Sequence, residues 1–232
     1  MFTRKLRVMP SDASLTGHIK LYNLLNYLQD TAELAVEGIE GKSTELYERG
    51  YSWVVTRYEI LFNGDLPKIC DEFTVSTYHD PNHSYNTLRN FHVKFGGREV
   101  VTAKTSWILA DVRTGRPVKP LAHIPAITSG DCSAIDDVFS EIPEIDTLSS
   151  EEHIRVKYHD TDYNGHVNHA VYFRWVYDIL NKPVKKISAS FRSGAKLGEN
   201  ITVKHNGGVF SIYRENNLRP CAKFLAEGDD VE

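Results

Sequence analysis

One pattern occurs twice in this chain at a fixed offset of 148 residues, and this repeat constrains the fold more than any other feature. Residues 17–19, Gly-His-Ile, align with residues 165–167, Gly-His-Val, and Asp12 aligns with Asp160 at the same offset. Self-similarity at a fixed spacing is typical of a duplicated unit. A chance match of the Gly-His-hydrophobic triplet is the alternative, but the flanking residues and the elements that follow match as well. We therefore expect two copies of one unit.

Each copy reads as a strand, a polar loop, a helix and then several strands. Apolar residues recur at helical spacing from about Leu21 to Ala35 and from about Asn168 to Leu180, which predicts one helix per copy. Runs rich in β-branched and aromatic residues, separated by Gly, Pro, Asn and Asp, predict the strands. These strands cover residues 3–9, 51–62, 71–79, 84–95 and 99–112 in the first copy, and residues 153–158, 185–192, 200–205, 208–214 and 221–227 in the second.

A lone helix followed by antiparallel strands predicts an α+β fold in which a curved sheet wraps one central helix. Two such units side by side could join their sheets and remove two exposed edges. We expect an N-terminal unit over residues 1–121 and a C-terminal unit over residues 153–232. Residues 122–152, which are rich in Pro, Ser, Asp and Gly, are expected to connect them.

Bulk composition excludes several classes of protein. The formal net charge of −4 provides no global basic field for a nucleic acid or a membrane surface. Apolar runs stay well below the roughly 18 residues of a membrane span, and the N-terminus lacks the apolar core of a secretory signal. Three widely spaced cysteines, Cys70, Cys132 and Cys221, indicate reduced thiols and a cytoplasmic protein.

Three separated segments resemble one enzyme family in the same order. They are "GYSWVVTRYEI" (50–60), "AKTSWILADVRTGRPVKP" (103–120) and "DYNGHVNHAVYFRWVYD" (162–178). The chain resembles the acyl-acyl-carrier-protein (acyl-ACP) thioesterases of plants and bacteria, which have a double hotdog fold, and the likeness covers nearly all of it. The "YxDTDxxGHVN" form also resembles the wider 4-hydroxybenzoyl-CoA thioesterase group. The resemblance implies a thioester hydrolase and assigns catalytic importance to Asp162, Asn164 and His166.

The chemistry of these residues agrees with that assignment. Thioester hydrolysis needs a base that activates water and donors that hold the developing oxyanion, while the thiolate is a fair leaving group. Asp162 is the candidate general base, or a direct nucleophile. In an extended loop, Asp162, Asn164 and His166 would point to one side. The N–H groups around Asn168 and His169, at the start of the helix, are candidate oxyanion donors.

Structural explanations compete with this reading. Asp162 or Asn164 could simply cap the helix, and Asp160 fits a loop or capping residue better than a catalytic one. His166 could be architectural, because the first copy keeps its counterpart His18 although Ser14 and Thr16 replace the aspartate and the asparagine. This loss predicts that the first copy is catalytically degenerate and holds the acyl chain instead.

Other site chemistries have less support. A metal site could be assembled from Asp162, His166 and His169, or from His79 and His83, but helical H-E-x-x-H spacing is missing. A triad based on Cys221 or a serine has no nucleophile elbow around it. We expect no metal and no other cofactor.

The chain departs from the resembled family further on. There the family has a glutamate on a strand, followed in plant members by a cysteine, and here Gly194 and Ala195 stand at those positions. The leading function is release of free fatty acid from acyl-ACP. Hydrolysis of acyl-CoA or another small thioester, and non-catalytic binding of acyl-ACP or an acyl chain, stay open as alternatives, and a hydratase on this fold is disfavoured by the polar loop.

The expected partner is an acyl-carrier protein bearing a phosphopantetheine thioester. Carrier protein is acidic, so its user should have a local basic patch. The candidates for such a patch, which could equally be a solvated strand face, are Lys182, Lys185, Lys186, Arg192 and Lys196. The sequence leaves a homodimer open.

Overall fold

The computed structural model describes residues 1–36, 41–81, 84–128, 133–145 and 150–229. The chain divides into two compact units: Met1–Thr56 with Phe62–Val138, and Arg57–Leu61 with Phe139–Glu232. Strand β2 (Tyr51–Phe62) contributes residues to both units. In the described part of the chain, every helix is too short or too polar to cross a bilayer.

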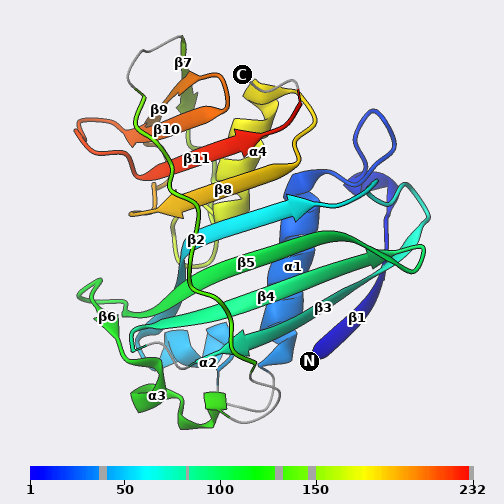
Figure 1. The fold of residues 1–232 in the computed structure, drawn as a ribbon. Coiled ribbons are helices and arrows are strands. Elements are labelled where there is room, and N and C mark those ends of the chain that lie inside the picture. Colours follow the sequence, from blue (N-terminus) through cyan, green and yellow to red (C-terminus); the bar gives the residue numbers. More distant parts are fainter. Residues whose placement is uncertain (37–40, 82–83, 129–132, 146–149, 230–232) are drawn as a thin grey trace. The chain divides into compact units, whose positions relative to one another are not determined.

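The first unit is a helix covered by an antiparallel sheet, as predicted. Helix α1 lies against strands in the order β1-β3-β4-β5 (Figure 1). Leu24, Leu25 and Leu28 of α1 are fully buried at the spacing that predicted the helix. The bounds are α1 Leu21–Ala35, β1 Phe2–Arg7, β3 Glu72–Asp80, β4 Asn86–Phe95 and β5 Arg98–Asp111.

Several short elements in and near the first unit were not predicted. Ile124 and Ile127, from the start of the predicted connecting segment, pack in one buried cluster with Leu46 and Leu109, so this part of the segment belongs to the first unit's core. The unpredicted elements are α2 (Ser43–Glu48), β6 (Pro117–Val118), α3 (Pro120–His123), and the 3₁₀ turns η1 (Pro10–Asp12) and η2 (Pro125–Thr128).

The second unit repeats the arrangement around helix α4. Its sheet runs β8-β11-β10-β9-β7, and residues Arg57–Leu61 of β2 pair with β8 on the other side. Phe173 of α4 meets Phe224 of the sheet edge to face, with ring centroids 5.0 Å apart. The bounds are β7 Ser150–Arg155, α4 His169–Leu180, β8 Lys186–Phe191, β9 Asn200–Asn206, β10 Val209–Arg214 and β11 Ala222–Glu227, with the 3₁₀ turn η3 at Tyr158–Asp160.

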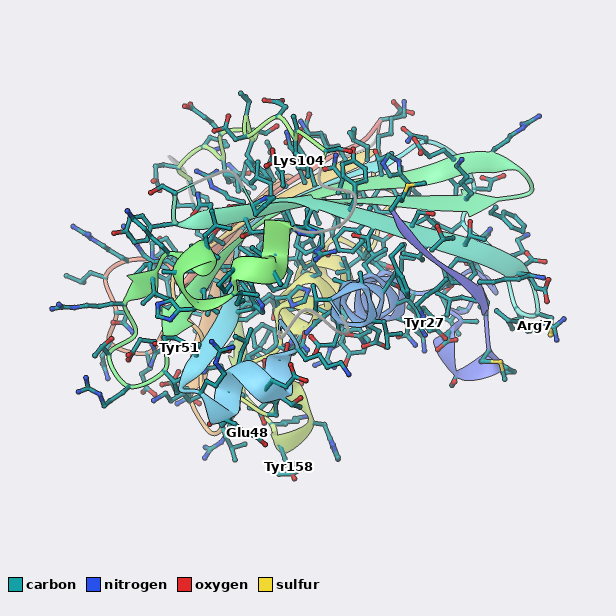
Figure 2. The ribbon with its side chains drawn as sticks, turned by 90° about the horizontal axis from the view of Figure 1, so that it is seen from below. Arg7, Tyr27, Glu48, Tyr51, Lys104 and Tyr158 are labelled. Carbon is teal, nitrogen blue, oxygen red and sulfur yellow. The ribbon has the colours of Figure 1, made fainter. Side chains whose placement is uncertain are left out.

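Hydrogen bonds around the two polar loops repeat at the offset seen in the sequence. The Asp12 carboxylate accepts the N–H of Met9 at 2.9 Å, and the Asp160 carboxylate accepts the N–H of Lys157 at 2.8 Å. The Asp12 carboxylate also accepts the hydroxyl of Tyr27, which lies on the side of α1 that faces η1 (Figure 2). The duplication therefore extends to a carboxylate that accepts the backbone N–H of the residue three positions before it in each loop.

A second pair of hydrogen bonds matches the two units, with donors 148 residues apart and acceptors 128 residues apart. The residue before each helix-capping position donates its N–H to a carbonyl on the segment after the helix: Ile19 to Pro67 at 2.9 Å, and Val167 to Ala195 at 2.8 Å. Pro67 and Ala195 are thus structural counterparts. By the same register, Leu66 of the first unit corresponds to Gly194 of the second.

Candidate active site

The polar loop before α4 is a tight turn closed by its own backbone. Thr161 and Val167 form an isolated antiparallel bridge, Asp162 N–H donates to the His166 carbonyl at 2.8 Å, and Gly165 N–H donates to the Asp162 carbonyl at 3.0 Å. Gly165 has a φ of +73°, a conformation that glycine adopts at little cost. The loop is therefore not the extended segment from which we predicted that alternate side chains share one side.

Asp162 is nevertheless the centre of a cluster, because the turn brings its neighbours back to it. Its Oδ1 accepts the N–H of Asn164 at 2.9 Å. Burial raises the pKa of Asp162, and hydrogen bonds from the Asn164 and His166 N–H groups, the charge of the His166 imidazole and the Asn164 side chain offset part of that rise. The three predicted catalytic residues thus lie together, around a half-buried carboxylate that is a stronger base than an exposed aspartate.

The start of α4 shows which residue caps the helix. Asn168 is the N-cap, and its side-chain oxygen accepts the N–H of Ala170 at 2.9 Å. Capping therefore does not explain the presence of Asp162 or Asn164. The N–H of Asn168 already donates to the Asp160 carbonyl at 2.9 Å, so we leave Asn168 out of the proposed oxyanion donors. The role of His169, the first residue of the helix, stays a prediction.

The side chain of His169 points into the interior of the second unit. Its ring stacks on Tyr58, with ring centroids 5.7 Å apart and planes 17° apart. Burial lowers the pKa of His169 to about 4, so the imidazole is neutral at neutral pH. A neutral ring at this place adds no competing positive charge beside the N-terminus of α4.

The counterpart loop of the first unit has the same backbone without the carboxylate. Ser14 N–H donates to the His18 carbonyl at 2.8 Å, just as Asp162 does to His166. Ser14 Oγ contacts Thr16 Oγ1 at 3.0 Å, and Thr16 Oγ1 contacts His18 Nδ1 at 3.1 Å. The first unit therefore keeps the geometry of the loop but has no acidic group at the position of Asp162.

Sequence reasoning missed two contacts that fix the loop of the second unit. Arg174 of α4 forms an ion pair with the buried Asp160 carboxylate at 2.6 Å, which agrees with an anchoring role for Asp160. The buried hydroxyl of Tyr172 accepts the N–H of Ala195 at 2.9 Å. The sequence did contain a signal for both contacts: Arg174 and Tyr172 are polar residues in a largely apolar helical segment.

The five candidate basic residues differ in exposure and in their ion pairs. Lys186 is directed inward: its side chain is 24% exposed, Nζ donates to Ser140 Oγ at 2.7 Å, and it lies 3.4 Å from a Glu227 carboxylate oxygen. Lys185 is exposed and pairs with Asp229 at 2.5 Å. The remaining three candidates, Lys182, Arg192 and Lys196, are exposed.

The structure also bears on the two alternative site chemistries, a cysteine nucleophile and a metal site. Burial raises the pKa of the Cys221 thiol to about 11, which makes it a poor nucleophile, whereas Cys70 is exposed. Within the described residues, no group of three or more His, Cys, Asp or Glu side chains could hold a metal ion. His83 and Cys132 lie outside the described residues.

Comparison with known proteins identifies the family. The acyl-ACP thioesterase N-terminal domain matches residues 1–127, and the C-terminal domain of the same family matches residues 144–219. None of the curated proteins matches the sequence.

Solved structures share the fold. A protein from Lactobacillus plantarum, provisionally named an oleoyl thioesterase, has a TM-score of 0.85 at 19% identity, with 97% of this chain and 94% of that chain covered. The 12:0-ACP thioesterase from Umbellularia californica has a TM-score of 0.82 at 17% identity, covering 97% and 96%. An acyl-ACP thioesterase from Bacteroides thetaiotaomicron has a TM-score of 0.79 at 19% identity, also covering 97% and 96%.

These similarities confirm the double hotdog architecture, a mixed fold of few helices and a large antiparallel sheet. The chain belongs to the acyl-ACP thioesterase family and is a thioester hydrolase.

Proposed function

We propose that this enzyme releases free fatty acid from acyl-ACP, with Asp162 as the general base. The observation that carries the proposal is a half-buried carboxylate, held by the amides of its own turn, directly before the N-terminus of α4. Asp162 removes a proton from water as the water oxygen attacks the thioester carbonyl carbon. The tetrahedral intermediate then expels the phosphopantetheine thiolate, which takes the proton from Asp162.

The neighbouring groups have separate roles in this proposal. Asn164 holds the thioester carbonyl or the water, and His166 orients the water or the carboxylate. The N–H of His169 faces the developing oxyanion, where the partial positive charge of a helix N-terminus is favourable. The cluster lies wholly in residues of the second unit, while the first unit is left to hold the acyl chain, as its loop without a carboxylate suggests.

Hydrolysis of a panel of acyl-ACP and acyl-CoA substrates tests the proposal. A general base contributes about 10²–10⁴-fold, so Asp162→Asn should lower kcat/KM by at least about 100-fold. Ser14→Ala, at the counterpart position of the first unit, is the matched control and should retain the wild-type rate. An Asp162→Asn enzyme with most of its activity would refute the mechanism, and a wild-type protein that binds but never hydrolyses these substrates would favour the non-catalytic alternative.

The carrier protein is proposed to dock on the exposed basic side chains Lys182, Lys185, Arg192 and Lys196, without Lys186, whose side chain is directed inward to Ser140 and Glu227. Exchanging Arg192 and Lys196 for glutamate should raise KM for acyl-ACP at low salt, because acidic partners are attracted through local positive charge. The same exchange should leave hydrolysis of a short pantetheine thioester unchanged. A cytoplasmic location stays a prediction of the sequence, and a homodimer stays open.

A further inference from the structure

The segment after β8 passes unusually close to His166. A Cβ atom placed at Gly194 would lie 2.9 Å from both Cβ and Cδ2 of His166, and 3.0 Å from its Cγ. Real Cβ atoms do not approach other atoms this closely, because ordinary contact begins near 3.4 Å. The His166 ring therefore occupies the space that any side chain at position 194 would need.

The backbone beside Gly194 is not free to move away from the ring. Ala195, which is fully buried, donates its N–H to the Tyr172 hydroxyl at 2.9 Å and accepts the N–H of Val167 at 2.8 Å. Arg192 N–H donates to the Cys221 carbonyl at 2.8 Å on the other side. With the segment held at both ends, His166 is the residue that must give way, and because its own Cβ is one of the three close atoms, its backbone must shift together with the ring.

The first unit provides an internal comparison. There the structural counterpart of Gly194 is Leu66, which carries a full side chain. The counterpart of Asp162 is Ser14, so the loop of the first unit has no carboxylate at this position for His18 to orient. The second unit, which has the carboxylate, thus has a glycine at the position where the first unit has a leucine.

We propose that Gly194 is a positioning residue of the active site: by lacking a side chain, it lets the His166 ring lie against the 193–195 backbone and beside Asp162. The inference rests on the proposed function, since it assigns Gly194 a part in the same reaction. Gly194 itself touches no reacting atom. It acts by fixing the place of the imidazole.

The test compares Gly194→Ala with a matched glycine. The new methyl group forces the His166 ring outward by several tenths of an ångström, and misplacement on the order of 1 Å can lower a rate by about 100-fold. We expect Gly194→Ala to lower kcat by about 10–100-fold with little change in KM. The control is Gly64→Ala, whose added Cβ would meet Val100 at an ordinary 3.4 Å, and it should retain the wild-type kcat.

Two further measurements separate positioning from loss of structure. The NMR signals of the His166 ring should shift in Gly194→Ala, and the acid limb of the kcat/KM pH profile should move because the imidazole charge acts on Asp162. The double variant Gly194→Ala/His166→Gly should recover the thermal stability lost in Gly194→Ala, because the clash is relieved, without recovering kcat.

The outcomes distinguish this inference from the proposed function. An active wild-type enzyme whose Gly194→Ala variant keeps its kcat and its His166 signals overturns the positioning role and leaves the proposed function standing. A wild-type protein without hydrolase activity defeats the proposed function and the positioning role of Gly194 with it, and the His166 signals then report only whether the close approach exists. A kcat loss that His166→Gly restores would also overturn the positioning role.

Discussion

The hydrogen bond between Tyr172 and Ala195 predicts that substitutions at these two positions have coupled effects on stability. The first unit has neither the hydroxyl nor the N–H at the corresponding positions. In the first unit the counterpart of Tyr172 is Leu24, and the counterpart of Ala195 is Pro67. Proline has no N–H, so an apolar leucine suffices there. In the second unit Ala195 has an N–H, and the Tyr172 hydroxyl accepts it at 2.9 Å in a buried environment.

Removing the hydroxyl by Tyr172→Phe should therefore leave a buried N–H without its acceptor. Such a loss costs about 1–3 kcal/mol, because the donor has already been desolvated. In an Ala195→Pro background the same change should cost much less, since the N–H is gone. We expect a coupling energy of about 1–2 kcal/mol between the two positions.

Urea denaturation of the wild type, both single variants and the double variant measures this coupling. Tyr177→Phe is the control, because Tyr177 lies on the same helix and is only half-buried, and it should change stability by less than about 0.5 kcal/mol. Amide exchange at Ala195 should accelerate in Tyr172→Phe. Free energies that add within about 0.5 kcal/mol would refute the reasoning, since residues without a shared contact behave that way.

Three further predictions concern single positions. Gly194→Glu, which restores the glutamate of the resembled family, should lower kcat by at least about 10-fold rather than raise it, because its Cβ would collide with His166; any gain in steady-state rate would contradict the geometry. The pKa of His169 is near 6.5 in the unfolded chain and about 4 in the native protein, so the unfolded state binds the proton first as the pH falls. The free energy of unfolding should therefore fall by roughly 3 kcal/mol between pH 6.5 and pH 4. His169→Phe should reduce this pH dependence in denaturation experiments. Cys70 has a φ of +70°, so Cys70→Gly should stabilise the protein by about 0.5–1 kcal/mol in thermal unfolding, and Cys70→Ala, which keeps the Cβ, should not.

Local periodicity was sufficient to predict the principal elements of the fold. Helix α4 begins at His169, one residue after the predicted start, because Asn168 is its cap. The predicted strands 200–205 and 208–214 are confirmed as β9 and β10, which pair with each other across a turn in which Gly207 has a φ of +54°. Helices α2 and α3 have six and four residues, which is too short for a periodic pattern to distinguish them from loops.

The structure places Asp162, Asn164 and His166 together in a tight turn rather than in the predicted extended loop, and their catalytic roles stay a prediction. Alternation would describe an extended loop, whereas the Asp162 side chain bonds its own turn and Gly165 adopts a positive φ, and the same residue types are compatible with either conformation. The approach of Gly194 to His166 is a tertiary contact between segments 28 positions apart in the chain. From the sequence alone, Gly194 could be described only as a position at which the glutamate of the resembled family is missing.

Strand β2 has a consequence for anyone who wishes to produce the catalytic half alone. Arg57 pairs with Ser190, and Leu61 with Lys186, so a strand encoded early in the gene completes the sheet of the later unit. A truncated product beginning at Phe139 would leave the backbone donors and acceptors along one side of β8 open to pairing with other molecules. Such a fragment should self-associate unless a peptide covering Arg57–Leu61 is supplied or fused to it.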